Sequence, residues 1–209
     1  TVESDWRRAG AMLSAIEALD AGDVLLLEMQ DYGDPACGES ADCLVPAEIN
    51  PEVWALTRNA VDSGIVVVAA GGNGSENLDE PWYQDNYLSM GDSGAIVVGA
   101  GMPNINHSWG YLNYGTRIDI QSWGYQVFTL SYDYLESLSN DPRQMYTTDF
   151  SGTSASAAIV AGAAALVQDW SKQELGRPLA PEGFRNLLVA SGIASGSSYP
   201  IGVHLDLHA

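Results

Sequence analysis

Phe150-Ser-Gly-Thr-Ser154-Ala-Ser-Ala-Ala-Ile-Val-Ala-Gly162 is the stretch of this chain that decides its fold. A Gly-Thr-Ser turn leads directly into a run of small and apolar residues, which predicts a buried helix that begins near Ser154. The backbone N–H groups of the first helical turn lack partners and the helix dipole is positive there, so developing negative charge is stabilised. Gly152 lets the backbone bend and lets a substrate approach closely. The small side chains that follow allow neighbouring strands to pack tightly against this helix.

On either side of this helix, apolar runs alternate between helical and strand patterns. Helices are predicted at 9–21, 51–63, 154–170 and 181–190, and strands at 24–29, 65–70, 95–100 and 117–123. Short runs rich in Val and Ile are typical of strands that are buried on both faces. The alternation predicts an α/β fold with a doubly wound, mostly parallel sheet and helices on both faces. No linker divides the 209 residues, so they are expected to belong to one domain.

Several segments, in order along the chain, resemble the subtilases, the family of subtilisin-like serine peptidases. Besides the run around Ser154, they are 64–74, 93–100, 113–124 and 200–207. The resemblance implies that Ser154 is the nucleophile and that Asn73 belongs to the oxyanion hole. One departure is Ala158, where many subtilases have proline, but alanine suits a helix and should not impair the chemistry.

The mechanism implied by this resemblance is acyl transfer. Ser154 Oγ would attack a peptide carbonyl after a histidine takes its proton. The side-chain amide of Asn73 and the backbone N–H of Ser154 would bind the oxyanion. Taken singly, Asn73 could be an ordinary Asn-Gly turn and Ser154 a helix-capping serine. The two motifs together favour the catalytic interpretation.

The resemblance also assigns residues to a substrate cleft for a peptide or protein. They are Glu28, Met29 and Gln30, then Ala70, Gly71 and Gly72, and the turn residues Gly152 and Thr153. In the family, such backbone edges pair with an extended peptide as added strands. Glu28 stands where a small polar residue is often found. It is either an acid that favours basic substrates or, the preferred interpretation, a structural carboxylate bonded to loop N–H groups.

The aspartate and histidine that a subtilase also needs do not occur in their expected contexts. The chain has His107, His204 and His208, and none of them precedes a Gly-Thr pair. Residues 1–22 resemble the helix that follows the catalytic histidine in this family. Residues 1–209 therefore resemble the C-terminal part of a single subtilase domain whose N-terminal part is missing. We expect the isolated chain to be inactive and a preceding segment or companion chain to supply Asp and His.

Two other functions stay open at this point. Sedolisins, the acid-acting relatives with a Glu-Asp-Ser triad, have a similar serine motif, and the acidic composition suits their working pH. Against them, sedolisins have an aspartate in the oxyanion hole, where this chain has Asn73. The other alternative is a non-catalytic subtilase-like module that binds a partner.

The charge balance limits the class of partner. The chain has 8 basic and 27 acidic residues and a formal net charge of -19, which disfavours nucleic acid and anionic membranes because both need a basic surface. No apolar run approaches the roughly 18 residues of a membrane span. The composition agrees with a secreted hydrolase, extracellular or periplasmic.

Cys37 and Cys43 lie in one polar loop and predict a small disulfide, as in an oxidising compartment. The alternative is a pair of thiols in a surface loop. No second Cys or His pair has zinc-ligand spacing, so no metal site is assigned. Subtilases often bind calcium, but Asn77, Asp79 and Glu80 do not make a complete ligand set. No cofactor is therefore expected, and calcium is left open.

Overall fold

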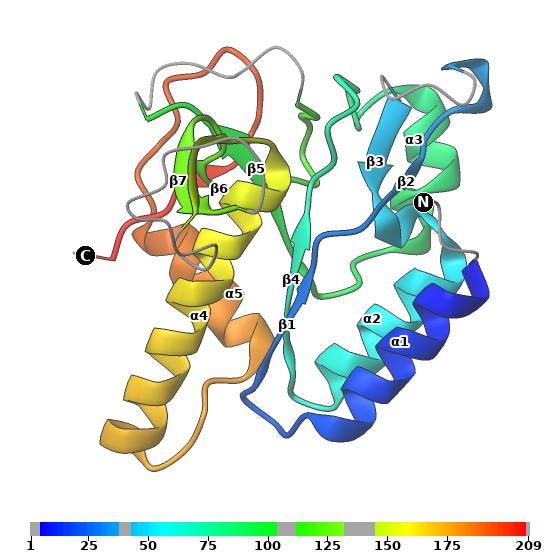
Figure 1. The fold of residues 1–209 in the computed structure, drawn as a ribbon. Coiled ribbons are helices and arrows are strands. Elements are labelled where there is room, and N and C mark those ends of the chain that lie inside the picture. The colour runs from blue at the N-terminus through cyan, green and yellow to red at the C-terminus, as the bar shows by residue number, and fades with distance from the viewer. Residues whose placement is uncertain (1–4, 38–42, 104–111, 132–144, 208–209) are drawn as a thin grey trace.

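The computed structural model describes residues 5–37, 43–103, 112–131 and 145–207. Three layers make up the fold, with a parallel sheet between two layers of helices (Figure 1). Helices α1 (Asp5–Ala18) and α2 (Pro51–Asp62) cover one face of the sheet, and α4 (Thr153–Leu175) and α5 (Pro181–Ser191) cover the other. The predicted doubly wound α/β fold is confirmed.

The central sheet has the strand order β1-β4-β5-β6-β9, and all its described pairs are parallel. The strands are β1 (Val24–Leu27), β4 (Val66–Ala70), β5 (Ile96–Gly101), β6 (Ile120–Trp123) and β9 (Val203–His204). Alternate residues of β4 enter two different cores: Val67 packs on the α1 and α2 side, and Val68 packs on the α4 and α5 side. Because both faces of β4 are buried, its sequence is apolar throughout.

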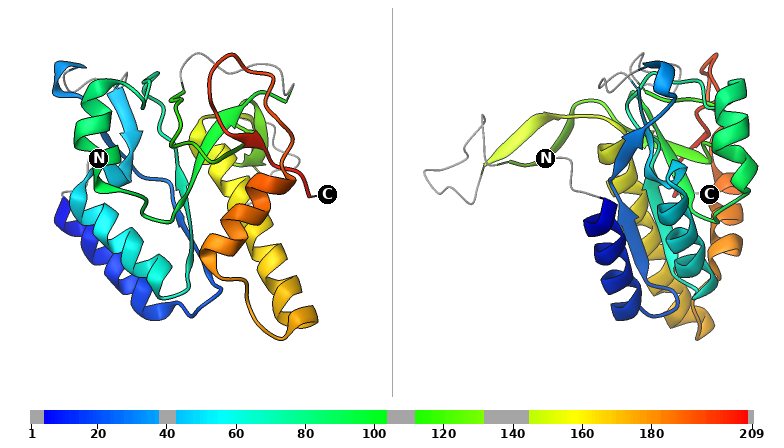
Figure 2. Two further views of the ribbon diagram at one scale, coloured as in Figure 1. Left: turned by 180° about the vertical axis from the view of Figure 1, so that it is seen from behind. Right: turned by 90° about the vertical axis from the view of Figure 1, so that its right-hand side faces the viewer.

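The smaller elements were not predicted from the sequence. The strands β2 (Gln30–Tyr32) and β3 (Leu44–Pro46) form one antiparallel pair, and β7 (Val127–Leu130) and β8 (Tyr146–Phe150) form another. The β7–β8 pair projects from the body of the molecule (Figure 2). One further helix, α3 (Pro81–Asn86), and three 3-10 turns, η1 (Pro35–Cys37), η3 (Ala47–Ile49) and η4 (Leu88–Met90), complete the described elements.

Local capping sets the ends of the main helices. The side chain of Asn50 accepts hydrogen bonds from the N–H groups of Glu52 and Val53 at the start of α2, and Pro51 occupies the first turn. The α4 helix runs five residues beyond its predicted end and stops before Gly176, which has a left-handed φ of 68°. Within the described residues, no helix combines the length and apolarity that crossing a membrane requires.

A buried ion cluster holds the amino ends of β5 and β6. Arg117 lies 2.7 Å from a carboxylate oxygen of Glu48 and 3.0 Å from one of Asp119. Tyr87 and Ser93 each donate a 2.6 Å hydrogen bond to Glu48, so both of its oxygens are engaged. Burial raises the pKa of Asp119 and that of Tyr87. The cluster is closed, since each charge within it faces a partner.

Candidate active site

The loop that follows β4 brings Asn73 to the start of α4. Asn73 Oδ1 accepts a 2.9 Å hydrogen bond from the Thr153 N–H and another of 2.9 Å from Thr153 Oγ1. Since a backbone N–H can only donate, Oδ1 and not Nδ2 must be the atom that faces it. Asn73 Nδ2 donates no hydrogen bond to a described residue. Thr153 therefore holds the oxygen of the Asn73 amide, while the N–H₂ group of the same amide has no partner among the described residues.

Ser154 is the second residue of α4 and directly follows Thr153. Its side chain is half-buried, and its hydroxyl forms no hydrogen bond with a described residue. Its backbone N–H belongs to the first turn, where such groups have no partner inside the helix. Gly152 precedes the helix with a φ of 105°, and a Cβ atom there would lie 3.1 Å from Asn73 Nδ2. Both observations explain why this position is glycine.

Asn113 forms hydrogen bonds with the backbone of the loop that carries Asn73. It is fully buried, and its Nδ2 donates to the carbonyl oxygens of Gly71 and Leu44, each at 2.8 Å. Its Oδ1 accepts from the N–H groups of Gly74 (3.1 Å) and Glu76 (2.9 Å). One amide thus satisfies four backbone groups on two segments. The sequence analysis assigned no role to Asn113, and only its place at the start of a family-like segment signalled it.

Gln30 and Thr153 complete the support of this loop. Gln30 Oε1 accepts a 2.7 Å hydrogen bond from the Asn73 N–H, and Thr153 Oγ1 accepts one of 3.0 Å from the Gly72 N–H. Both residues were predicted to contact substrate. The structure uses their side chains to position Asn73.

The segment 70–72 is hydrogen-bonded within the protein. The Gly71 N–H donates to the carbonyl of Val98 at 2.8 Å, and the Gly71 carbonyl accepts from Asn113. Ala70 is a buried residue of β4 and pairs with Val98. Gly71 and Gly72 thus use main-chain groups within the protein, and the pairing of Ala70, Gly71 and Gly72 with a peptide stays a prediction.

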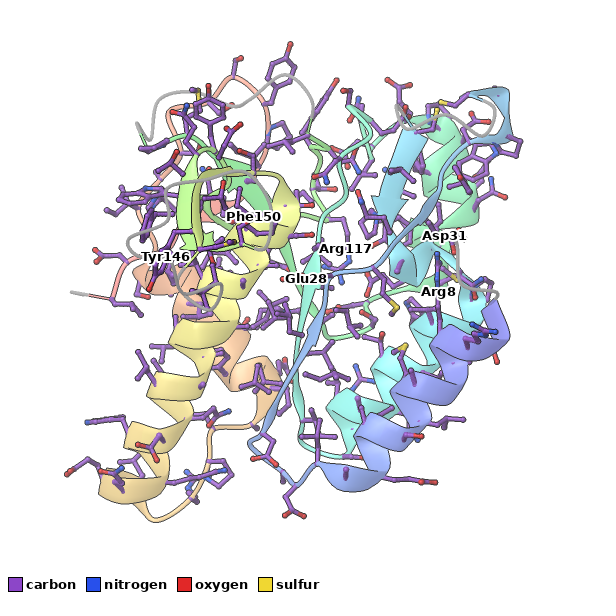
Figure 3. The ribbon with its side chains drawn as sticks, in the orientation of Figure 1. Arg8, Glu28, Asp31, Arg117, Tyr146 and Phe150 are labelled. Atoms are coloured by element: carbon purple, nitrogen blue, oxygen red, sulfur yellow. The ribbon has the colours of Figure 1, made fainter. Side chains whose placement is uncertain are left out.

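Glu28 and Met29 follow the end of β1 (Figure 3). Glu28 is exposed and forms no hydrogen bond with a described residue, so the loop N–H groups of the preferred interpretation are not among the described residues, and that interpretation stays a prediction. Partial burial raises the pKa of Glu28. Met29 packs against the core on the α1 and α2 side.

No described histidine is paired with Ser154. His204 lies on β9 opposite Gln121 of β6, with its Nδ1 2.9 Å from the carbonyl oxygen of Leu205. Its Nε2 is buried without a hydrogen-bond partner among the described residues. His107 and His208 lie outside the described residues.

Cys37 and Cys43 are not joined by a disulfide, so that prediction is wrong for this structure. The Cys37 thiol instead donates a 3.3 Å hydrogen bond to Glu76 Oε1. The hydrogen bond between the two thiols, then burial and the neighbouring Glu76 carboxylate, raise the pKa of Cys37 to about 12. The sequence indicated that the two cysteines are neighbours but not that a carboxylate from another loop lies beside them.

The side chains considered as calcium ligands are hydrogen-bonded to one another and to Thr116. The Asp79 carboxylate accepts hydrogen bonds from the Thr116 N–H at 3.0 Å and from the Thr116 hydroxyl at 2.6 Å. Asn77 Nδ2 donates to Glu80 at 3.1 Å. These contacts explain why the three oxygen-bearing side chains gather without assigning an ion to them.

A model of the subtilase family matches residues 36–199 of this chain. The fold is similar to that of a lanthipeptide protease, with a TM-score of 0.71 and 19% identity over 97% of this chain and 65% of that one. It is also similar to the self-cleaved protease domain of PatA, with a TM-score of 0.64 and 19% identity over 96% of this chain and 64% of that one. A cold-adapted subtilisin-like serine proteinase matches with a TM-score of 0.65 and 16% identity over 94% of this chain and 59% of that one. The chain thus spans less than two thirds of each of these proteins. No curated protein matches its sequence.

Proposed function

Since the chain belongs to the subtilase family, we propose that it is the part of a serine endopeptidase that carries the nucleophile and the oxyanion site. The observation that carries this proposal is the pair of hydrogen bonds that Asn73 Oδ1 accepts from Thr153, the residue before Ser154. These bonds leave Asn73 Nδ2 without a hydrogen-bond partner among the described residues. The family match is to subtilases, and the asparagine at position 73 agrees with that family rather than with sedolisins.

In the proposed reaction, Ser154 Oγ forms a bond to the carbonyl carbon of a peptide while a general base takes the hydroxyl proton. The carbonyl oxygen becomes an oxyanion and accepts hydrogen bonds from Asn73 Nδ2 and the Ser154 N–H. Collapse of this intermediate breaks the C–N bond, and the amine leaves with the proton. Water then releases the acyl group from Ser154 by the reverse sequence.

The oxyanion site acts by being fixed before charge develops. Asn73 is bonded through its side chain to Thr153 and through its backbone to Gln30, so it has little freedom to reorient. A single preorganised donor of this type contributes about 10²- to 10³-fold in rate. The positive end of the α4 dipole acts on the same oxygen.

The proposal assigns the general base and its orienting aspartate to a preceding segment or a companion chain. Two observations support this assignment. The hydroxyl of Ser154 has no imidazole partner among the described residues, and β1 is an edge strand of the described sheet. An edge strand has unpaired backbone groups that another strand can satisfy. The proposal places the enzyme outside the cytoplasm, the usual location of subtilases.

Glu28 contributes to the choice of substrate in this proposal. Its carboxylate is exposed at the end of β1 and forms no hydrogen bond with a described residue. A negative charge that is not already paired favours a basic side chain on a bound peptide. The substrate expected is therefore an extended peptide with Lys or Arg near the cleaved bond.

A fluorophosphonate probe tests the nucleophile directly, because it labels only an activated serine. The natural protein, purified from its host, should be labelled at Ser154, and Ser154→Ala should abolish the labelling. The matched control is Ser151→Ala in the same turn, which should retain it. The 209-residue chain alone should not be labelled.

Other outcomes would overturn the proposal. If the folded natural protein is not labelled at all, the chain is a non-catalytic subtilase-like module. If the isolated 209-residue chain is labelled at Ser154, the general base lies within it and the companion segment is not needed.

A further inference from the structure

Three potential metal ligands converge at one point outside the proposed active site. The sulfur atoms of Cys37 and Cys43 and a carboxylate oxygen of Glu76 all lie within 4.8 Å of one another. Among the described residues, no other group of three or more Cys, His, Asp or Glu side chains lies close enough together to hold an ion. Cys43 is buried and Cys37 is half-buried.

The spacing of these atoms is close to that of a tetrahedral zinc site. With Zn–S distances of about 2.3 Å and Zn–O distances of about 2.1 Å, tetrahedral geometry separates the ligand atoms by about 3.6–3.8 Å. Cys37 Sγ lies 3.3 Å from Glu76 Oε1, and the third atom completes the triangle within 4.8 Å. Side-chain shifts of no more than about 1 Å would therefore bring the three atoms to the separations of a tetrahedral site.

The surroundings hold the carboxylate in place. The Tyr83 hydroxyl donates a 2.8 Å hydrogen bond to Glu76 Oε2, which leaves Oε1 directed at Cys37. The backbone N–H of Glu76 is bonded to Asn113, so the residue is fixed from its main chain as well. Hydrogen bonds of this type to a ligating carboxylate are the usual support of a metal site.

We propose that Cys37, Cys43 and Glu76 bind a thiophilic divalent cation of the Zn²⁺ type, with water in the fourth position. On binding, each thiol loses its proton to solvent as a metal–sulfur bond forms, and the carboxylate oxygen becomes the third ligand. The sequence analysis excluded zinc because no second Cys or His pair is present. It missed Glu76, which is 39 residues from Cys37 along the chain.

The geometry favours a metal over a disulfide at this place. A disulfide needs a sulfur–sulfur distance of about 2.0 Å and no third group. Here a carboxylate is positioned beside the sulfurs, and the Cys37 thiol is bonded to it. A divalent cation would offset two of the three negative charges carried by two thiolates and a carboxylate, whereas a disulfide would leave Glu76 without its thiol donor.

The ion would join two segments that support Asn73. Leu44, next to Cys43, accepts a hydrogen bond from Asn113, and a Cβ atom on Gly72 would lie 2.6 Å from the Leu44 carbonyl oxygen. Glu76 lies on the other segment, three residues beyond Asn73. Metal binding is therefore expected to raise the melting temperature, and to raise it further as the concentration of free metal increases.

Cobalt substitution tests the site in the natural protein carrying Ser154→Ala, which removes the proposed nucleophile so that the readout does not depend on peptidase activity. After reduction and removal of metals, Co²⁺ should bind with one equivalent, produce thiolate-to-cobalt charge-transfer absorption, and be displaced by Zn²⁺. Cys37→Ser should remove about half of that absorption, and Glu76→Gln should weaken binding at least about tenfold. The matched control is Glu80→Gln, four residues beyond Glu76 on the same segment, which should leave binding unchanged.

Three results would overturn the proposal, and none of them depends on peptidase activity. The first is the lack of charge-transfer absorption in the reduced, folded protein. The second is equal Co²⁺ affinity in the parent protein and Glu76→Gln. The third is a zinc-free Cys37–Cys43 disulfide in protein purified without reductant, shown by mass spectrometry and metal analysis.

Discussion

The two ends of the central sheet bury polar groups in different ways. At the amino ends of β5 and β6, Arg117 is locked between the carboxylates of Glu48 and Asp119. Beyond the carboxyl end of β4, the neutral amides of Asn73 and Asn113 hold a glycine-rich loop. The charges at the ionic end are paired, whereas at the amide end the N–H₂ group of Asn73 and the hydroxyl of Ser154 have no hydrogen-bond partner among the described residues. The ionic end therefore stabilises the fold, whereas the amide end has polar groups left over that could bind a reacting group.

The physical reason for the difference lies in what each set of bonds can do. A buried ion pair is costly to break, because removing one partner leaves an uncompensated charge. A buried ion pair therefore resists the loss of either partner, but it does not orient a free donor or acceptor toward another group. An amide has a donor end and an acceptor end, so anchoring the acceptor of Asn73 also aims its donor. Four changes test whether the two ends are really divided in this way.

The largest expected effect is at the ionic end. Arg117→Met should lower the free energy of unfolding by about 3–5 kcal/mol, because it leaves two buried carboxylates without their partner. Urea denaturation measures this loss. The activity per folded molecule should not change. The control is Arg58→Met, whose partner Asp62 is exposed and whose loss should cost less than about 1 kcal/mol. Equal losses for the two variants would break the comparison.

The next effect is catalytic and belongs to the amide end. Asn73→Ala in the natural protein should lower kcat by about 10²- to 10³-fold, equal to about 2.7–4 kcal/mol, with little change in KM. Steady-state kinetics on a peptide substrate provide the measurement. Asn77→Ala is the matched control, because this asparagine lies in the same loop and bonds only within it. A comparable loss of kcat in both variants would contradict the oxyanion role.

A third change tests how tightly the loop is held. Gly72 has a φ of +85°, and a Cβ atom there would lie 2.5 Å from Asn113 Nδ2. Gly72→Ala should therefore destabilise the protein by about 1–3 kcal/mol and also lower kcat. Gly183→Ala is the control: this glycine lies in α5 with open space around it, so alanine should stabilise by about 0.5–1 kcal/mol. Thermal melting of the two variants distinguishes them. A stable Gly72→Ala variant with normal kcat would show that the loop is not held tightly.

How much could be predicted from the sequence depended on the distance along the chain between interacting groups. Long periodic runs predicted the main helices and strands, because burial imposes a period on neighbouring residues. The motif around Ser154 predicted the start of α4 in the same local way, and the nucleophile role of Ser154 stays a prediction. The role of Asn113 could not be predicted, since its partners lie 37 to 69 residues away. The predicted disulfide was wrong for the same reason, because Glu76 approaches Cys37 from a distant loop.

The smallest expected effect concerns pH at the ionic end. Asp92 pairs with Arg185, and this hydrogen bond, more than any other contact, lowers the pKa of Asp92. The unfolded state therefore takes up a proton at a higher pH than the folded state, near the ordinary value of about 3.9. The stabilisation is fully present above that pH, decreases as the pH falls below it, and is lost once the pH has also fallen through the lowered pKa of the folded state. Asp119 acts in the opposite direction, because burial raises its pKa and the folded state takes up the proton first.

Asp92→Asn isolates the first of these two contributions. The side chain of Asp92 is 54% exposed, so solvent screens the pair and the loss at pH 7 should be under about 1 kcal/mol. The difference in melting temperature between the parent protein and the variant should shrink as the pH falls below about 4, while the Asp119 contribution stays in both. Arg185→Gln should reproduce the same pH dependence, since it removes the other half of the pair. A difference that stays constant from pH 7 to pH 3 would mean that the pair does not stabilise this end of the sheet, and that the cluster around Arg117 does so alone.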